Sequence, residues 1–212
     1  MDEFDQKMEI SEQPQEEIVE KIPGRDVYET VSSLVSALLV VVLVFTFLVR
    51  LMGVSGPSMI PTLQDGDRLL VVNSLLCGDY QVGDIVIARK ETFDSKPIVK
   101  RVIATEGQTV DILYDGNGYG TVYVDGEPLD EPYILEPMVL PYYDRTSFPL
   151  TVDEGCLVVM GDNRNRSADS RYASIGQIEE SQVIGKVLCI LFPGCGESSS
   201  RDFGRIGALD NG

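Results

Sequence analysis

The sequence contains no histidine, and this absence excludes several kinds of catalytic and metal site. Peptidases of the Ser-His-Asp and Cys-His types need an imidazole to take up the proton of their nucleophile. Zinc sites built on histidine are excluded as well. Any nucleophile in this chain must therefore be activated by another base.

Basic residues are scarce relative to acidic ones. The 212 residues include 34 Asp and Glu against 17 Lys and Arg, which gives a net charge of −17. Such a chain repels a phosphate backbone, so we expect no nucleic-acid partner. The sequence shows no internal repeat and no motif for a metal, a nucleotide or another cofactor, so we expect neither a cofactor nor a metal. The length suits one folded domain with additional segments.

Cysteine is also sparse, and the four residues are not grouped into a C-x-x-C pair. This spacing excludes a zinc ribbon and a thioredoxin-type motif. We expect free thiols at Cys77, Cys156, Cys189 and Cys195. A disulfide between Cys189 and Cys195, across the Pro-Gly pair that separates them, is the alternative.

One long apolar run stands near the N-terminus. Residues 30–49 carry no charge, and a helix of this length spans roughly 30 Å, the thickness of a bilayer core. We predict a transmembrane helix over residues 30–52, preceded by an acidic, disordered tail over residues 1–29. A cleavable signal peptide is the alternative, but it would begin with a short basic segment, whereas this leader is long and acidic.

Residues 53–195 are rich in short Val- and Ile-containing runs that Gly, Asp, Asn or Pro bound. This pattern is typical of strands in an all-β barrel or sandwich, so we predict a mainly β domain. Turn pairs such as Asp-Gly and Asn-Gly crowd residues 111–150, which predicts a hairpin-rich insertion. Residues 196–212 are rich in Ser and Gly, and we expect a flexible C-terminal tail.

A serine and a lysine in this domain are candidates for chemistry. Ser58 lies between Pro57 and Pro61, which restrict the backbone around it. Lys100 shares one face of a predicted strand with the apolar side chains of Ile98, Val102 and Ala104. Burial there would lower the lysine pKa and let the amine act as a general base. Taken alone, each residue would be interpreted as structural: Ser58 as a turn serine, and Lys100 as a lysine that reaches solvent or pairs with an acid.

Four motifs follow one another in the chain: GPSMIPTL, GDIVIARK, IVKRVIATEGQTV and the polar loop GDNRNRSADSRYASIG. Together, behind an apolar run, they resemble bacterial type I signal peptidase of peptidase family S26, of the Gram-positive type. The resemblance covers about residues 30–192. It implies a signal-peptidase/LexA-like, β-barrel-type catalytic domain after one transmembrane helix.

The resemblance also implies roles for individual residues. Ser58 corresponds to the nucleophile and Lys100 to the general base. Ser167 corresponds to a serine that orients the lysine amine, and Asp169 and Arg171 to an ion pair that holds the last motif in place. Some family members use a hydroxyl at the position of Gly56 in the oxyanion hole. Here a backbone N–H, a water or Ser55 would have to replace it.

The expected substrates are membrane-inserted preproteins, cut after small-x-small residues at the end of their signal peptides. An extended substrate would pair with an exposed strand edge, for which residues 82–87 are a candidate. Apolar residues near the dyad would line shallow pockets. The predicted substrate contacts are Val54, Gly56, Met59, Leu63, Ile85, Ile87 and Val99.

This activity places the protein in the plasma membrane as a single-pass protein in contact with the lipid bilayer. Residues 53–212 would be extracytoplasmic and the acidic tail cytoplasmic, because signal peptides are cut on the far side. Two alternatives remain open. One is an enzyme of the same fold with a narrow client list; the other is an anchored β-domain that binds an extracellular ligand and uses Ser58 and Lys100 only structurally.

Overall fold

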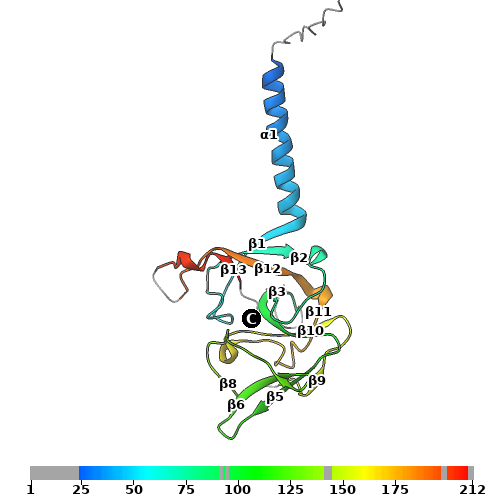
Figure 1. The fold of residues 1–212 in the computed structure, drawn as a ribbon, viewed down its shortest axis with the longest axis vertical. Helices are drawn as coiled ribbons and strands as arrows, with labels where there is room; N and C mark the ends of the chain where they lie inside the picture. The colour runs from blue at the N-terminus through cyan, green and yellow to red at the C-terminus, as the bar shows by residue number, and fades with distance from the viewer. Residues whose placement is uncertain (1–23, 91–92, 94–95, 141–144, 197–199, 210–212) are drawn as a thin grey trace, which may run out of the picture. The chain divides into compact units, whose positions relative to one another are not determined.

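The computed structural model describes residues 24–90, 93, 96–140, 145–196 and 200–209 (Figure 1). Most of the predicted acidic tail, residues 1–23, lies outside this part. By contacts the chain divides into two units, residues 1–41 and 42–212, which we describe separately.

An apolar helix forms the described part of the N-terminal unit and continues along the chain to Leu48. The helix α1 spans Arg25–Leu43, and the short π-helix η1 spans Val44–Leu48. Together they form 24 residues with a mean hydropathy of 2.7, long and apolar enough to cross a membrane. The helix begins before the expected start at residue 30, because an Arg25–Glu29 ion pair and Asp26 in the first turn suit a helix N-terminus.

An antiparallel sheet of eight strands forms most of the second unit. Its order is β1-β2-β12-β3-β4-β10-β11, and β13 pairs with β12. The strands are β1 (Val49–Gly53), β2 (Arg68–Asn73), β3 (Ile85–Ala88), β4 (Ile98–Thr105), β10 (Cys156–Met160), β11 (Ile178–Glu179), β12 (Val183–Phe192) and β13 (Gly207–Ala208). Short 3-10 helices lie between them at Ser74–Leu76, Arg164–Arg166, Glu180–Gln182 and Phe203–Arg205.

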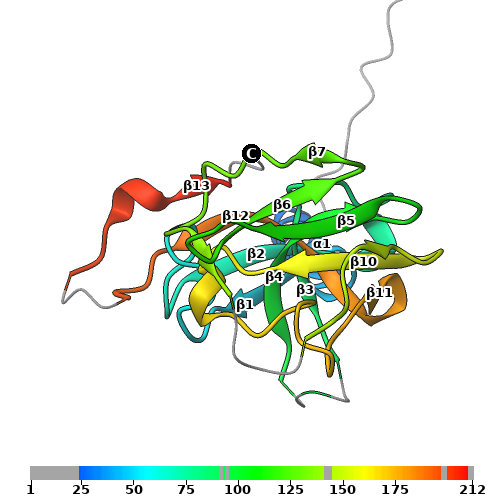
Figure 2. The same cartoon turned by 90° about the horizontal axis from the view of Figure 1, so that it is seen from below.

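A second sheet of five strands occupies the region predicted to be a hairpin-rich insertion. Its order is β7-β6-β5-β9, and β8 pairs with β6. The strands are β5 (Thr109–Tyr114), β6 (Tyr119–Val124), β7 (Glu127–Pro128), β8 (Met138–Val139) and β9 (Leu150–Thr151). Within this unit the second sheet lies at the end away from β1, and Figure 2 shows the same arrangement from below. The prediction of a mainly β domain after one apolar helix is confirmed.

Two predicted boundaries need correction. Residues 49–52 are not the end of the apolar helix but most of strand β1, which pairs with β2 from Val49↔Val72 to Gly53↔Arg68. The described part of the C-terminal tail is also ordered into structure: β13 pairs with β12, and Arg205 forms an ion pair with the buried Asp67. All four cysteines are free thiols.

One hydrophobic cluster supports the segment that carries Ser58. This cluster joins the strands β2, β3 and β12 to the loop between β1 and β2, residues 54–67. We call it the nucleophile loop, after the role that the family resemblance implies for Ser58. Because Met59 and Leu63 anchor that loop with almost no exposed surface, its backbone is held against the sheet. The buried members are Val54, Met59, Leu63, Leu69, Val71, Ile85, Ile87, Val187 and Ile190.

Candidate active site

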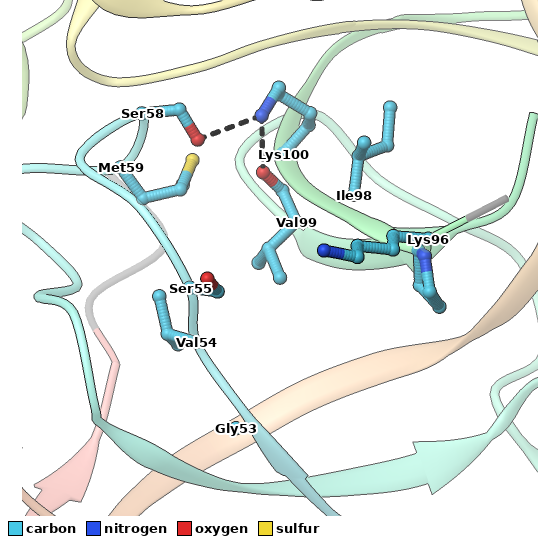
Figure 3. Close-up of a pocket in the computed structure, with 10 residues that line it drawn as sticks. Gly53, Val54, Ser55, Ser58, Met59, Lys96, Ile98, Val99 and Lys100 are labelled. Carbon is cyan, nitrogen blue, oxygen red and sulfur yellow. Dashed lines mark hydrogen bonds between the residues drawn. The ribbon is translucent and has the colours of Figure 1, made fainter. Parts of the chain in front are cut away.

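Ser58 and Lys100 meet although they are 42 positions apart in the chain. Ser58 lies in the nucleophile loop and Lys100 in β4, and their side chains point toward one another (Figure 3). Lys100 Nζ donates a hydrogen bond to Ser58 Oγ at 2.9 Å and another to the Val99 carbonyl at 2.9 Å. The carbonyl therefore fixes the direction in which the amine faces the hydroxyl.

The surroundings of Lys100 favour its neutral form. The residue is only 4% exposed, and it lies opposite the buried Val86 of β3. Burial lowers the pKa of the Lys100 ammonium from 10.5 to about 8. The Asp169 and Asp162 carboxylates act in the opposite direction, while Arg171 adds to the lowering. A substantial share of the amine can thus be neutral near neutral to mildly alkaline pH.

The polar loop after β10, residues 161–171, holds the Ser58 backbone from one side. The Asn163 N–H donates to Ser58 O at 3.0 Å, and Asn163 Nδ2 donates to Pro57 O at 3.1 Å. Asn163 is itself buried. Sequence reasoning did not assign this residue a role, although it lies in the last of the four motifs.

Asp169 and Arg171 form a bidentate ion pair inside the same loop. Arg171 Nε donates to Asp169 Oδ1 at 2.8 Å, and Arg171 Nη2 donates to Asp169 Oδ2 at 2.8 Å. Burial of the Asp169 carboxyl acts to raise its pKa, but the Arg171 guanidinium and the Gly161 N–H outweigh burial and hold that pKa below its ordinary value. The pair also ties the loop to itself, because Arg171 Nη2 donates to Arg164 O at 2.7 Å.

Ser167 lies beside Ser58 but does not bond Lys100. The hydrogen bonds of Lys100 Nζ go to Ser58 Oγ and Val99 O instead. A Cβ on Gly161 would lie 2.3 Å from Ser167 Oγ and 2.4 Å from Ser58 O. Only glycine therefore allows the two serines to pack this closely, a requirement that the sequence did not reveal.

A second ion pair connects β4 to the polar loop, and Thr62 of the nucleophile loop joins it by a hydrogen bond. Arg101 Nε and Nη2 donate to the two carboxylate oxygens of Asp162 at 2.9 and 2.8 Å, and both side chains are buried. The Thr62 hydroxyl donates to the same carboxylate, and the Arg101 guanidinium lies 3.9 Å from the centre of the Tyr133 ring. These contacts fix the loop of Ser58 relative to the strand of Lys100.

A cavity of about 350 Å³ opens beside the two side chains (Figure 3). Two segments line it, one on either side: residues 53–55 with Ser58 and Met59, and residues 96–100. Three predicted substrate contacts, Val54, Met59 and Val99, lie on this lining. Ser55 lines it as well, together with Lys96 and Pro97, which sequence reasoning did not single out.

Four predicted substrate contacts do not line this cavity, and their expectation is corrected. Leu63, Ile85 and Ile87 are at most 1% exposed and belong to the core. β3 lies between β12 and β4, so residues 82–87 offer no free edge over β3 to an incoming strand. The fourth predicted contact, Gly56, already donates its N–H to Asp65 Oδ1 at 2.8 Å.

Within the described part of the chain, no group of three or more His, Cys, Asp or Glu side chains could hold a metal ion. The chemistry that the described residues bring together is that of a hydroxyl beside a buried amine. Such a pair suits nucleophilic attack by the serine with the amine as base.

Comparison with known proteins gives a consistent result. Residues 27–192 match the family model described as signal peptidase, peptidase S26. The chain is 37% identical over 179 residues to a probable signal peptidase I-1 of Synechocystis, covering 81% of this chain and 85% of that protein. It is 36% identical over 174 residues to a signal peptidase I of Bacillus licheniformis, covering 78% and 89%. A crystal structure of an Enterococcus faecalis signal peptidase I superposes with a TM-score of 0.40 at 28% identity, over 52% of this chain and 97% of that one.

Proposed function

This chain belongs to the signal peptidase family, peptidase S26, whose members are serine peptidases that remove signal peptides, and from this membership we propose that it is a membrane-anchored endopeptidase that works with a Ser58/Lys100 dyad. The observation that carries the proposal is the 2.9 Å contact between Lys100 Nζ and Ser58 Oγ in a buried setting. The resemblance of the four sequence motifs to this family is confirmed by the same comparisons.

Acylation begins with Lys100 in its neutral form. The amine nitrogen accepts the Ser58 hydroxyl proton across the 2.9 Å contact while Ser58 Oγ attacks the scissile carbonyl carbon. The Lys100 ammonium then gives this proton to the leaving amide nitrogen. The C–N bond breaks, the mature protein leaves with a free amino group, and the signal peptide stays as an ester on Ser58.

Deacylation repeats the sequence with water. Lys100, neutral again, removes a proton from a water molecule that attacks the ester carbonyl. The ammonium returns the proton to Ser58 Oγ as the ester bond breaks, and the signal peptide leaves with a new carboxylate. The Val99 carbonyl keeps the amine directed at the hydroxyl throughout, because it accepts a second hydrogen bond from Nζ.

The oxyanion of each tetrahedral intermediate needs hydrogen-bond donors. We assign the backbone N–H of Ser58 as one donor. The Gly56 N–H is committed to Asp65 and does not serve. Ser55 is the candidate for the second donor, because it lines the cavity together with Ser58, and a water molecule is the alternative. Ser55→Ala distinguishes the two: loss of a donor costs roughly 10²- to 10³-fold in kcat, whereas a water-based donor leaves kcat unchanged.

The substrate would bind as an extended strand between the two segments that line the cavity. β3 pairs with β4 from Ile98 onward, but β10 pairs with β4 only from Arg101 to Thr105. Within the described residues, the second edge of β4 therefore has no strand partner at Ile98 and Val99. Main-chain hydrogen bonds there would bind a peptide without regard to sequence, and the confined cavity would favour small-x-small residues.

The apolar helix would anchor the enzyme in the plasma membrane with the catalytic unit extracytoplasmic. Val54 and Met59, close to Ser58, are only 7% and 1% exposed and offer almost no surface for contact with lipid. Exposed apolar side chains on β1 and β12 are better suited to contact the membrane. These include Leu51, Leu188, Leu191 and Phe192. Protease added to intact spheroplasts should digest the catalytic unit; protection of this unit would reverse the orientation.

Cleavage of a preprotein in detergent or lipid tests the function directly. We expect the full chain to release the mature protein, and Ser58→Ala and Lys100→Ala to be inactive but folded. Lys100→Arg should be equally inactive, because a guanidinium does not lose a proton in this pH range. An active Lys100→Arg enzyme would exclude lysine as the base. An anchored ligand-binding domain would cleave in none of these assays.

Ser167 does not bond Lys100 in this structure, and we propose that its hydroxyl turns to the lysine amine only during the reaction. Ser167 is buried, and its hydroxyl and Ser58 O both lie close to Gly161, where a Cβ would clash with each of them. Ser167→Ala should lower kcat while the melting temperature stays near that of the wild type. Asp169→Ala should instead lower the melting temperature, because it leaves the Arg171 guanidinium buried without its partner.

A further inference from the structure

The segment after β12 extends beyond the family match, which ends at residue 192. Its described residues nevertheless return to the catalytic unit. β13 pairs with β12 through Cys189↔Ala208 and Ile190↔Gly207, and Leu209 packs against the cluster that contains Val54 and Met59. In Figure 1 this segment is the orange-to-red part of the ribbon beside β12.

Arg205 connects this segment to the base of the nucleophile loop. Its Nη1 and Nη2 donate to the two carboxylate oxygens of Asp67 at 3.0 and 2.7 Å, and Nη2 also donates to Thr62 O at 3.1 Å. Asp67 has no exposed surface. A bidentate contact of this kind fixes direction as well as distance, which a single point charge would not.

The backbone before Arg205 approaches the same loop closely. The Gly194 N–H donates to Asp67 Oδ1 at 2.7 Å, and the Gly196 N–H donates to Asp65 O at 3.2 Å. A Cβ on Gly194 would lie 2.1 Å from Asp65 O and 2.6 Å from Asp67 N. The segment therefore contacts the loop at two successive points, and Arg205 is its charged contact.

Asp67 closes the loop that carries the nucleophile. Its carbonyl accepts from the Val54 N–H at 2.9 Å, and the Gly66 N–H donates to Val54 O at 3.0 Å. The Asp67 carboxylate accepts a further bond from the Gln64 N–H at 2.8 Å. A shift of Asp67 would therefore move both ends of the loop, and with them Ser58.

We propose that Arg205 is a positioning residue that holds the nucleophile loop, through Asp67 and Thr62, at the distance at which Ser58 Oγ meets Lys100 Nζ. The inference rests on the proposed Ser58/Lys100 function. Arg205 touches neither reacting group, so its effect is on geometry: a displacement of about 1 Å in a reacting group costs on the order of a hundredfold in rate.

The test compares Arg205→Ala and Arg205→Lys with Arg201→Ala in the full-length enzyme. Arg201 is a matched control, because it lies in the same segment and its guanidinium stacks on Phe192 at 4.8 Å. Among the described residues it makes no hydrogen bond or ion pair to the nucleophile loop. The measurement is the single-turnover rate of preprotein cleavage with enzyme in saturating excess. It is made as a function of pH, at a temperature where thermal melts show each variant to be folded.

For Arg205→Ala we expect a rate roughly ten- to a hundredfold lower than that of Arg201→Ala, with unchanged substrate affinity. The acidic limb of its pH profile should move to higher pH, because a loosened loop admits water to Lys100 while its charged neighbours Asp162, Asp169 and Arg171 stay in place. Arg205→Lys keeps the positive charge but not the bidentate geometry of the guanidinium, so its rate should lie between those of Arg201→Ala and Arg205→Ala. If Arg205→Ala fails to fold, the rate of Arg205→Lys provides the test.

Equal rates and equal pH limbs for the Arg205 and Arg201 variants would overturn the inference. So would a lower melting temperature for the Arg205 variants with an unchanged rate and limb, since that is the mark of a purely structural contact. The proposed function is judged separately in the same assay: if the wild type does not cleave, or Ser58→Ala does, the Ser58/Lys100 assignment itself fails.

Discussion

The backbone N–H of Asn163 donates a hydrogen bond to the carbonyl oxygen of Ser58, the proposed nucleophile, at 3.0 Å. Its side-chain Nδ2 donates to Pro57 O at 3.1 Å, so one buried residue holds two successive carbonyls of the nucleophile loop. Arg205 and Asn163 therefore contact this loop at different places, one near its base and the other at Ser58 itself.

Asn163→Ala should lower kcat about tenfold or more and leave KM nearly unchanged. The substitution removes one of two donors to the Pro57 carbonyl and leaves the Ile60 N–H at 3.2 Å, a loss of about 1 kcal/mol. The peptide that joins Pro57 to Ser58 is then less firmly held. Steady-state kinetics with a preprotein provide the measurement. Asn165→Ala is the control, because Asn165 is exposed and bonds only Glu136, Pro137 and Val139. Similar kinetics for both variants would contradict the role of Asn163.

The pH dependence of cleavage should follow the Lys100 amine. Because burial lowers the pKa of Lys100 to about 8, kcat/KM should rise from neutral pH and level off about one unit above that value. The chain has no histidine to which a limb in this range could be assigned. NMR of the labelled lysine amine, recorded beside the rate profile, checks the assignment. A Lys100 that titrates near 10.5 while the rate limb lies near 8 would not be the base.

Lys100→Met should abolish cleavage and make the domain more stable at pH 7. The lysine pKa is about 8 in the folded state against 10.5 in the unfolded state. Below pH 8 both states are protonated, and the buried charge lowers the free energy of unfolding by on the order of 3 kcal/mol. Between pH 8 and 10.5 the unfolded state binds more protons, so the wild type gains stability as the pH rises.

Urea unfolding at pH 7 and at pH 10 tests this reasoning. The advantage of Lys100→Met should be large at the lower pH and should shrink at the higher one. A matched control is Lys90→Met, because Lys90 is only partly buried and bonds Gln177 O and Gln182 Oε1 at the surface of the sheet. A constant difference between wild type and Lys100→Met at both pH values would exclude a desolvated Lys100.

Truncation should reveal where the catalytic unit begins. Removal of residues 1–43 keeps strand β1, whereas removal of residues 1–53 deletes its five paired residues and exposes the edge of β2. The shorter chain should therefore lose about 2–4 kcal/mol of unfolding free energy, as several hydrogen bonds at about 1 kcal/mol each would suggest. Its activity should fall as well, because Val54 begins the nucleophile loop. Equal melting temperatures for the two truncated chains would mean that β1 contributes nothing.

The sequence was sufficient for those features that local pattern determines. Twenty uncharged residues indicate a spanning helix, and Val- and Ile-rich runs between turn residues indicate strands. The end of the helix could not be located, because Val49, Leu51 and Met52 are apolar enough to continue it past Arg50. They become a strand only because β2, some twenty residues later, provides hydrogen-bond partners.

Features that depend on pairing between residues far apart in the chain could not be predicted from the sequence. Ile85 and Ile87 seemed able to line a substrate pocket, but β12 and β4 enclose β3, and strand order cannot be read from a run of residues. Gly and Ser in the C-terminal segment suggested a flexible tail, yet Arg205 forms an ion pair with Asp67, 138 positions away in the chain. The Ser58/Lys100 meeting could be expected only because the four motifs resemble a known family.

Strand β1 follows the apolar helix with no linker between them, and this connection limits where cleavage can occur. From Leu48, the last residue of the helix, to Ser58 the chain has ten residues, which reach at most ~33–36 Å when fully extended. With the helix in a bilayer, the hydroxyl can never stand farther than this from the membrane surface. Under the proposed function, cleavage would therefore be confined to small-x-small sites close to the membrane, and an identical site in an exported domain far from the surface would not be cut.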